Sequence, residues 1–250
     1  MKFSYKIVNH SLQGKSHYKN DIPCQDKTYF LDSNNIKVAS LSDGAGSCKY
    51  SHIGAEIATK LCAEYVVENF HDIYDNFNNE TIGKEIFTKI INQINLDIEQ
   101  RTKKKVDQNK QERTIEKYNE EINHDSDSDK ISVQDYSSTL LFVAFFNDKY
   151  IIGHIGDGLI AVNDEKLKVL SDPDNGETSN STFFFTHKSA EKHLRLKKGR
   201  IDKSTTFILM SDGTYECIYD RQEKEFSAAL YKFIEWIEEG NQKDVSDAIL

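Results

Sequence analysis

The chain has 250 residues, of which 38% are hydrophobic and 29% charged, and its formal net charge is −9. This length predicts one substantial core, and we expect residues 1–250 to form a single domain. The acidic charge, without a basic patch interleaved with aromatic residues, argues against nucleic-acid binding. The sequence has no apolar leader region and no apolar run long enough to span a bilayer, so we expect a cytoplasmic protein with no membrane partner.

Short apolar stretches bounded by Asn, Asp and Ser predict strands at residues 3–9 and 27–41. From Ser51 the apolar period becomes helical, and we expect a helix that reaches about Phe70 with Ser51 as its N-cap. A second helix is predicted from about Thr81, because isoleucines recur there on one stripe: Ile82, Ile86, Ile90, Ile94 and Ile98.

Mixed charges with almost no core-forming residues dominate residues 101–132. We expect a mobile, charged insertion there, made of a solvated helix end followed by a linker. Its lysine cluster is offset by neighbouring Asp and Glu residues, so it does not favour nucleic-acid binding.

The second half of the chain carries the clearest strand pattern. Apolar runs at 137–146, 150–157 and 158–162 are joined by short turns, which is typical of central antiparallel strands in a sandwich. Residues 182–186 predict a further strand, and residues 223–238 predict an amphipathic helix. A β-sandwich core with helices packed outside it fits this order best.

Two apolar runs at opposite ends of the chain finish in the same tripeptide, Ser42-Asp43-Gly44 and Ser211-Asp212-Gly213. A carboxylate at the mouth of a buried strand, followed by glycine, can deliver oxygen ligands to a divalent cation. Asp-Gly alone is more typical of a hairpin turn. The apolar frames, and the continuation of the first motif into a helix, favour two halves of one metal site.

The ordered motifs of the chain resemble those of the metal-dependent serine/threonine protein phosphatases of the PPM, or type 2C, family, in particular its small bacterial branch. The matching segments follow the family order: Gly14-Lys15-Ser16-His17, Pro23-Cys24-Gln25-Asp26, Asp43-Gly44-Ala45-Gly46-Ser47 with Gly54-Ala55, Ser138-Thr139-Leu140, Gly156-Asp157-Gly158, Asn180-Ser181-Thr182-Phe183 and Ser211-Asp212-Gly213. Each motif is weak alone, but their shared order makes chance a poor explanation.

The resemblance implies the α+β class and a four-layer α-β-β-α sandwich, in which two antiparallel sheets are flanked by helices and a two-metal site lies at one end. It also implies that Asp43 bridges two Mn²⁺ or Mg²⁺ ions, that the Gly44 carbonyl binds one ion and that Asp212 binds the other. Asp26 would hold metal-bound water or the metal itself. Asp157 matches a position that helps to hold a weak third ion, although an Asp between two glycines equally suits a tight turn.

The chain departs from the family pattern at several positions. Gln25 stands where many members have Glu, and Ala45 where eukaryotic members carry a histidine proposed as general acid. The arginine with which many relatives grip phosphate has no counterpart, which leaves His17 and Lys19 as candidates for phosphate binding.

The last metal-binding aspartate of the family has no clear match in this sequence. Either Asp247 belongs to a clipped version of the final strand, or residues 244–250 begin a helix and that strand is missing. We favour the helix, because the segment follows a break at Gly240.

The predicted function is hydrolysis of phosphoserine and phosphothreonine on proteins by a two-metal-activated water. Its partners would be a phosphorylated protein substrate and a cognate Ser/Thr kinase or the target of that kinase. The alternative is a catalytically weak or inactive regulatory or binding module with a phosphatase fold. Hydrolysis of small phosphate esters or nucleotides is a third possibility, and it depends on residues 165–200.

Overall fold

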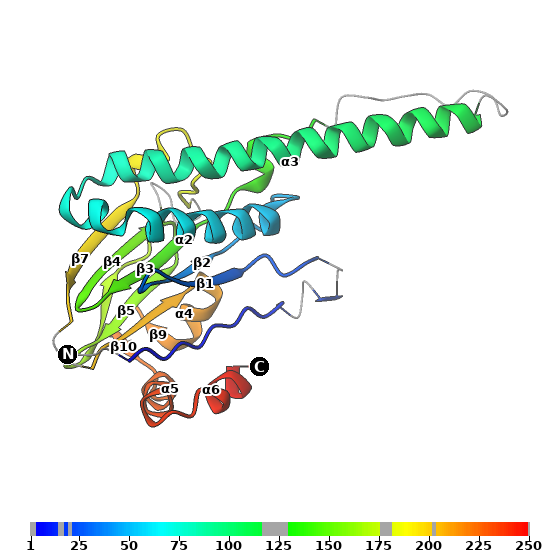
Figure 1. The fold of residues 1–250 in the computed structure, drawn as a ribbon. Coiled ribbons are helices and arrows are strands. Elements are labelled where there is room, and N and C mark those ends of the chain that lie inside the picture. The colour runs from blue at the N-terminus through cyan, green and yellow to red at the C-terminus, as the bar shows by residue number, and fades with distance from the viewer. Residues whose placement is uncertain are drawn as a thin grey trace.

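Two antiparallel sheets stack between two layers of helices in the computed structural model of the chain (Figure 1). The structure describes residues 4–14, 18–19, 22–116, 130–175, 182–201 and 204–249. The predicted four-layer α-β-β-α sandwich of the α+β class is therefore confirmed.

The larger sheet has the strand order β1-β2-β3-β4-β7, and the smaller sheet has the order β6-β5-β8. Neighbouring strands run antiparallel in both sheets. A short hairpin, β9-β10, stands apart from them. The bounds are β1 (Lys27–Ser33), β2 (Ile36–Ser42), β3 (Leu140–Phe146), β4 (Lys149–Ile155), β5 (Leu159–Asn163), β6 (Leu167–Ser171), β7 (Arg195–Arg200), β8 (Thr206–Met210), β9 (Tyr219–Asp220) and β10 (Glu225–Phe226).

Helices cover the outer face of each sheet. The α-helices are α2 (Ser51–Asp75), α3 (Asn79–Glu116), α4 (Asp212–Ile218), α5 (Ala228–Glu239) and α6 (Gln242–Ile249), and the two short 3₁₀ helices are η1 (Val133–Tyr136) and η2 (Ala190–Lys192). Helix α2 packs on β1, β2 and β3, and α3 packs on α2. On the opposite side, Tyr215 of α4 and Leu230 and Ile234 of α5 pack against the smaller sheet.

The core has one apolar layer between each pair of neighbouring structural layers. The predicted isoleucine stripe of α3 is buried from Ile82 to Ile94 and faces α2, in the same cluster as the outer side chains of the larger sheet. Alternate residues of β3 point to opposite sides, so Phe142 packs beneath the helices while Leu141 and Val143 pack between the sheets. Because β3 is the central strand and is covered on both faces, its sequence is a continuous apolar run.

A polar pair also joins the two sheets. His154 of β4 is fully buried, and its Nδ1 lies 2.9 Å from the hydroxyl of Ser171 on β6. Burial lowers the pKa of His154, because the charged imidazolium would lose its hydration.

Three local sequence predictions differ from the structure, whereas the strands predicted within 27–41 are present as β1 and β2. These two strands are joined at Asn34 and Asn35, whose positive φ angles of 54° and 62° make the turn. Residues 4–9 form no strand. Residues 182–186 form no strand either, because their aromatic side chains pack from a turn, with Phe185 in the core. The helix predicted over 223–238 begins only at Ala228, after the β9-β10 hairpin.

Ser51 is not the N-cap of α2. The cap is Tyr50, and Ser51 is the first helical residue. Its hydroxyl instead accepts a hydrogen bond from Gln25. The residue expected to cap the N-terminus of α2 therefore links α2 to the segment before β1.

The insertion predicted over 101–132 stays a prediction, since residues 117–129 lie outside the described ranges. Residues 101–116 continue α3, which projects well beyond the sandwich (Figure 1). Both ends of the expected segment contact the body. Arg101 pairs with Asp97 and lies 4.8 Å from the centre of the Tyr50 ring, and Ile131 packs on the core.

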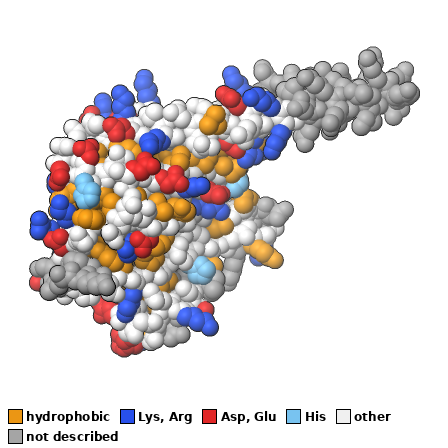
Figure 2. Space-filling model, viewed as in Figure 1, with side chains coloured by type: hydrophobic (Ala, Val, Ile, Leu, Met, Phe, Trp, Pro, Cys, Tyr) orange, Lys and Arg blue, Asp and Glu red, His pale blue; other side chains and the backbone are white. Residues whose placement is uncertain are grey.

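None of the helices that the structure describes is long and apolar enough to cross a bilayer. On the face shown in Figure 2, basic and acidic side chains are interspersed and do not gather into a basic patch.

Gly54 marks the closest approach of α2 to η1. A Cβ built at Gly54 would lie 1.9 Å from the carbonyl oxygen of Tyr136. Alanine normally stabilises a helix by about 1 kcal/mol relative to glycine. Here we expect Gly54→Ala to lower the free energy of unfolding by about 1–3 kcal/mol, because backbone must move. Urea unfolding measures the change. Gly14→Ala is the control, since a Cβ there meets nothing within 4 Å, and equal stability of both variants would contradict the packing.

Candidate active site at one end of the sandwich

The strand registers bring four aspartates to one end of the sandwich. Lys27 pairs with Ser42, so Asp26, just before β1, lies beside Asp43, just after β2. Leu159 pairs with Met210, which places Asp157, before β5, near Asp212, after β8. Packing of β2 against β8 joins the two pairs across the sheets. The two Ser-Asp-Gly motifs therefore meet at one end, as the sequence predicts.

The carboxylates of Asp26 and Asp212 both interact with that of Asp43. The pKa of Asp43 is raised from 3.8 to about 10, most of all by burial and in the same direction by the two neighbouring carboxylates. Each neighbour disfavours a second negative charge at close range. A cation bound at this site would offset the repulsion that disfavours ionisation of Asp43. The hydroxyl of Ser211 donates to Asp26 Oδ2 over 3.1 Å and ties two of the strand ends together.

The residues just before β3 hold the loop that carries Asp43 in place. The backbone N–H of Asp43 donates to Thr139 Oγ1 over 2.9 Å, and the N–H of Thr139 donates back to the Asp43 carbonyl over 2.8 Å. The hydroxyl of Ser42 donates to that of Ser138 over 2.9 Å. The Ser138-Thr139 motif of the sequence thus positions the aspartate rather than entering the site.

Gln25 and Gly44 fix the same loop against α2. Gln25 is 7% exposed, and its side-chain nitrogen donates to Ser51 Oγ over 2.7 Å and to the Ala45 carbonyl over 3.3 Å. A Cβ at Gly44 would lie 2.9 Å from three atoms of Ser51. Only glycine therefore lets the loop pass this close to the start of α2. Gln25 braces the loop, and its amide nitrogen does not face the carboxylates.

Asp157 lies near Asp212. It accepts a hydrogen bond from Thr182 Oγ1, and burial raises its pKa, as does the charge of Asp212. Both aspartates line a pocket of about 240 Å³. The other described residues that line it are Asn175, Thr182, Tyr215, Glu216 and Arg221.

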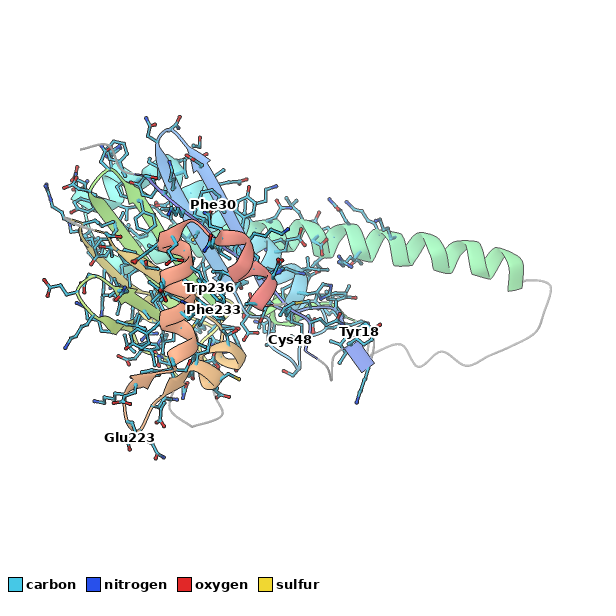
Figure 3. All side chains as sticks on the ribbon, turned by 90° about the horizontal axis from the view of Figure 1, so that it is seen from below. Tyr18, Phe30, Cys48, Glu223, Phe233 and Trp236 are labelled. Atoms are coloured by element: carbon cyan, nitrogen blue, oxygen red, sulfur yellow. The ribbon has the colours of Figure 1, made fainter. Side chains whose placement is uncertain are left out.

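Two sequence candidates lie apart from this group, and a third, His17, falls outside the described residues. Lys19 is exposed, next to Tyr18, which projects at the end of the N-terminal segment (Figure 3). Asp247 is exposed on α6 and belongs to a helix, which agrees with the second of the two alternatives for this segment.

The donor set suits a hard divalent cation, although it is not a preformed cage. Within the described ranges, no group of three or more His, Cys, Asp and Glu side chains is arranged so that it could hold a metal ion. Mg²⁺ and ions like it keep several waters and need only one or two carboxylates each. The partly buried pairs that Asp43 forms with Asp26 and with Asp212 fit that requirement.

A family model described as Protein phosphatase 2C matches residues 13–249. The chain belongs to the protein phosphatase 2C family. The resemblance drawn from the sequence motifs is therefore confirmed, and the match spans nearly the whole chain, including α5 and α6.

Individual relatives are distant in sequence. The chain is 24% identical over 212 residues to serine/threonine-protein phosphatase 3 of Escherichia coli (strain K12), which covers 82% of this chain and 72% of that protein. The photosystem II phosphatase PBCP has a similar fold, with a TM-score of 0.50 at 10% identity over 85% of this chain and 68% of that chain. The catalytic domain of the serine threonine protein phosphatase PstP, solved in complex with two manganese ions, has a TM-score of 0.47 at 14% identity over 87% of this chain and 80% of its own.

Sequence reasoning missed Arg221 and Glu216 of the pocket. Glu216 lies one helical turn after Asp212, a spacing that could have indicated it. Arg221 falls in a charged stretch between Asp220 and Glu225, and nothing in that stretch distinguishes it from a solvated turn residue.

The raised pKa of Asp43 predicts how the metal-free protein responds to pH. Between pH 4 and about 10 the folded protein holds a proton that the unfolded chain releases. Its stability is therefore greatest at low pH and falls as pH rises through that range, by up to about 1.4 kcal/mol per pH unit. Asp43→Asn should remove this slope and stabilise the metal-free protein near pH 8. Urea unfolding in EDTA between pH 5 and 9 measures it.

Asp164→Asn is the control for that experiment. A hydrogen bond from Lys168 lowers the pKa of Asp164 to about 2, so this group is ionised in both states above pH 4. The variant should keep the wild-type slope. A slope that survives Asp43→Asn would show that another group binds the proton.

Proposed function

We propose that this protein removes phosphate from phosphoserine and phosphothreonine residues of proteins, with the help of two Mn²⁺ or Mg²⁺ ions. The observation that carries the proposal is the meeting of Asp26, Asp43 and Asp212 at one end of the sandwich in a member of the protein phosphatase 2C family. The proposed partners are a phosphorylated protein and a Ser/Thr kinase that acts on it. Four unpaired cysteines fit action in the reducing cytoplasm.

Each carboxylate has a distinct role in this proposal. Asp43 interacts with both neighbours, so it is the residue that would bridge two ions. Asp26 and the Gly44 carbonyl would complete one side, and Asp212 the other. Asp157 lies near Asp212 and would contribute to a weaker third ion at the pocket. The charge of the carboxylates makes the ions necessary, because a phosphate dianion cannot approach them otherwise.

In this proposal the protein contributes to catalysis mainly by positioning the reacting groups. When bound, the ions supply positive charge to the phosphoryl oxygens and lower the pKa of water. Phosphoryl transfer otherwise demands little covalent participation from the protein, and alignment of nucleophile and leaving group is its main requirement. The hydrogen bonds from the Asp43 loop to Thr139, and from Gln25 to Ser51, would hold that alignment.

Hydrolysis of p-nitrophenyl phosphate and of a phosphothreonine peptide should require Mn²⁺ and stop in EDTA. Asp43→Asn should lower kcat by more than about tenfold, or about 1.4 kcal/mol of barrier, because it removes the charge between the ions. Asp32→Asn is a matched control, since Asp32 forms only a surface ion pair with Lys37 at 3.1 Å. Activity that persists in EDTA would exclude the metal mechanism, and the absence of Mn²⁺ binding by calorimetry would favour the regulatory or binding module.

Asp247→Ala should leave Mn²⁺ binding and turnover unchanged within about twofold. The side chain is exposed on α6, and surface substitutions of this kind alter stability by less than about 0.5 kcal/mol. Calorimetric titration with Mn²⁺ at pH 7.5 measures the affinity. A weaker affinity with an unchanged melting temperature would make Asp247 a metal ligand after all.

A further inference from the structure

The pocket beside Asp212 opens directly from the carboxylate group. Asp212 interacts with Asp43 and also lines the pocket, so anything bound in the pocket lies next to the proposed metal ligands. Three of the described lining residues are acidic: Asp157, Asp212 and Glu216. A phosphate group that enters therefore meets mostly negative charge.

Arg221 is the single cationic side chain among the described residues that line this pocket. Its charge acts on Tyr215, as do the charges of Glu216, Asp157 and Asp212, so four charged groups lie near one ring. No described residue forms a hydrogen bond or an ion pair with the exposed Arg221, although three carboxylates line the same pocket. Its guanidinium donors remain available to a ligand.

The backbone around Arg221 is well braced. Arg221 follows β9 in the turn of the β9-β10 hairpin, which Glu223 marks in Figure 3. Asp220 Oδ1 accepts hydrogen bonds from the N–H groups of Gln222 (2.8 Å) and Glu223 (3.0 Å). These bonds stabilise the turn that contains Arg221.

The base of the hairpin is fixed as well. The rings of Tyr219 and Phe226 lie 4.6 Å apart, and the N–H of Ser227 donates to the Ile218 carbonyl over 2.7 Å. Since β9 follows α4, and α4 begins at Asp212, one continuous unit carries both the proposed metal ligand and the arginine.

We propose that Arg221 binds the phosphoryl oxygens of the substrate in this pocket and so takes the role that the sequence suggested for His17 and Lys19. The inference rests on the proposed phosphatase function. The planar guanidinium can donate two parallel hydrogen bonds to a phosphate, which a lysine ammonium cannot reproduce. The acidic side chains of the pocket repel phosphate. Arg221 would offset this repulsion and hold the phosphoryl group beside Asp212.

The test compares Arg221→Ala, Arg221→Lys and Arg200→Ala with the wild type at saturating Mn²⁺. The control residue Arg200 is also exposed, but it pairs with Asp148 at 3.0 Å, where β7 lies beside the start of β4. Substrates are p-nitrophenyl phosphate and a phosphothreonine peptide, and inorganic phosphate serves as the product inhibitor. We expect Arg221→Ala to raise both KM values and the phosphate inhibition constant by about tenfold or more. Arg221→Lys should recover part of that loss, and Arg200→Ala should change nothing.

Each other outcome overturns the inference in a distinguishable way. If wild-type protein hydrolyses both substrates but Arg221→Ala keeps the wild-type phosphate inhibition constant, Arg221 does not bind phosphoryl oxygens. A KM increase for the peptide alone would mean that Arg221 contacts a neighbouring acidic residue of the peptide instead. If the wild type hydrolyses neither substrate, the proposed function fails. Calorimetry with inorganic phosphate then decides the inference separately: binding that Arg221→Ala abolishes would support it, and equal or absent binding would overturn it.

Discussion

Electrostatic repulsion among the carboxylates of Asp26, Asp43 and Asp212 is the constraint on which this site depends. Like charges at such short range favour separation or protonation, and together with burial, the larger cause, they raise the pKa of Asp43. The strand ladders oppose this repulsion, because Asp26 and Asp43 adjoin the paired ends of β1 and β2, and Asp212 lies just after β8. The apolar layer between the sheets then holds the two sheets, and so the three carboxylates, together.

Hydrogen bonds from neighbouring polar groups fix the position of the loop that carries Asp43. Thr139 holds both backbone groups of Asp43, and Gln25 connects the next residues of the loop to the start of α2. A buried amide with its donors satisfied adds rigidity where an unsatisfied one would destabilise the fold. Gln25 is neutral and therefore adds no negative charge beside the three carboxylates.

Charge also organises the approach to the site. The net charge of −9 gives the molecule no long-range attraction for a phosphorylated partner, so recognition of phosphate has to be local. The pocket beside Asp212 combines acidic walls with Arg221 on a braced turn. Cations bound at the carboxylates would neutralise their negative charge. Together with the guanidinium of Arg221, they would make the pocket locally positive where a phosphate enters.

The sequence by itself determined the layers of the fold and the main carboxylates. Strand β3 is buried on both faces and is therefore a continuous apolar run, whereas α3 is buried on one face and carries an isoleucine stripe. Both patterns repeat over neighbouring residues, so they can be recognised in the sequence alone. Asp43 and Asp212 stood out because each follows such a run. Tertiary structure alone decided the role of Gln25, the turn at Phe183 to Phe185 and the place of Arg221. Those features depend on contacts between segments distant in sequence, and no local pattern encodes which segments will meet.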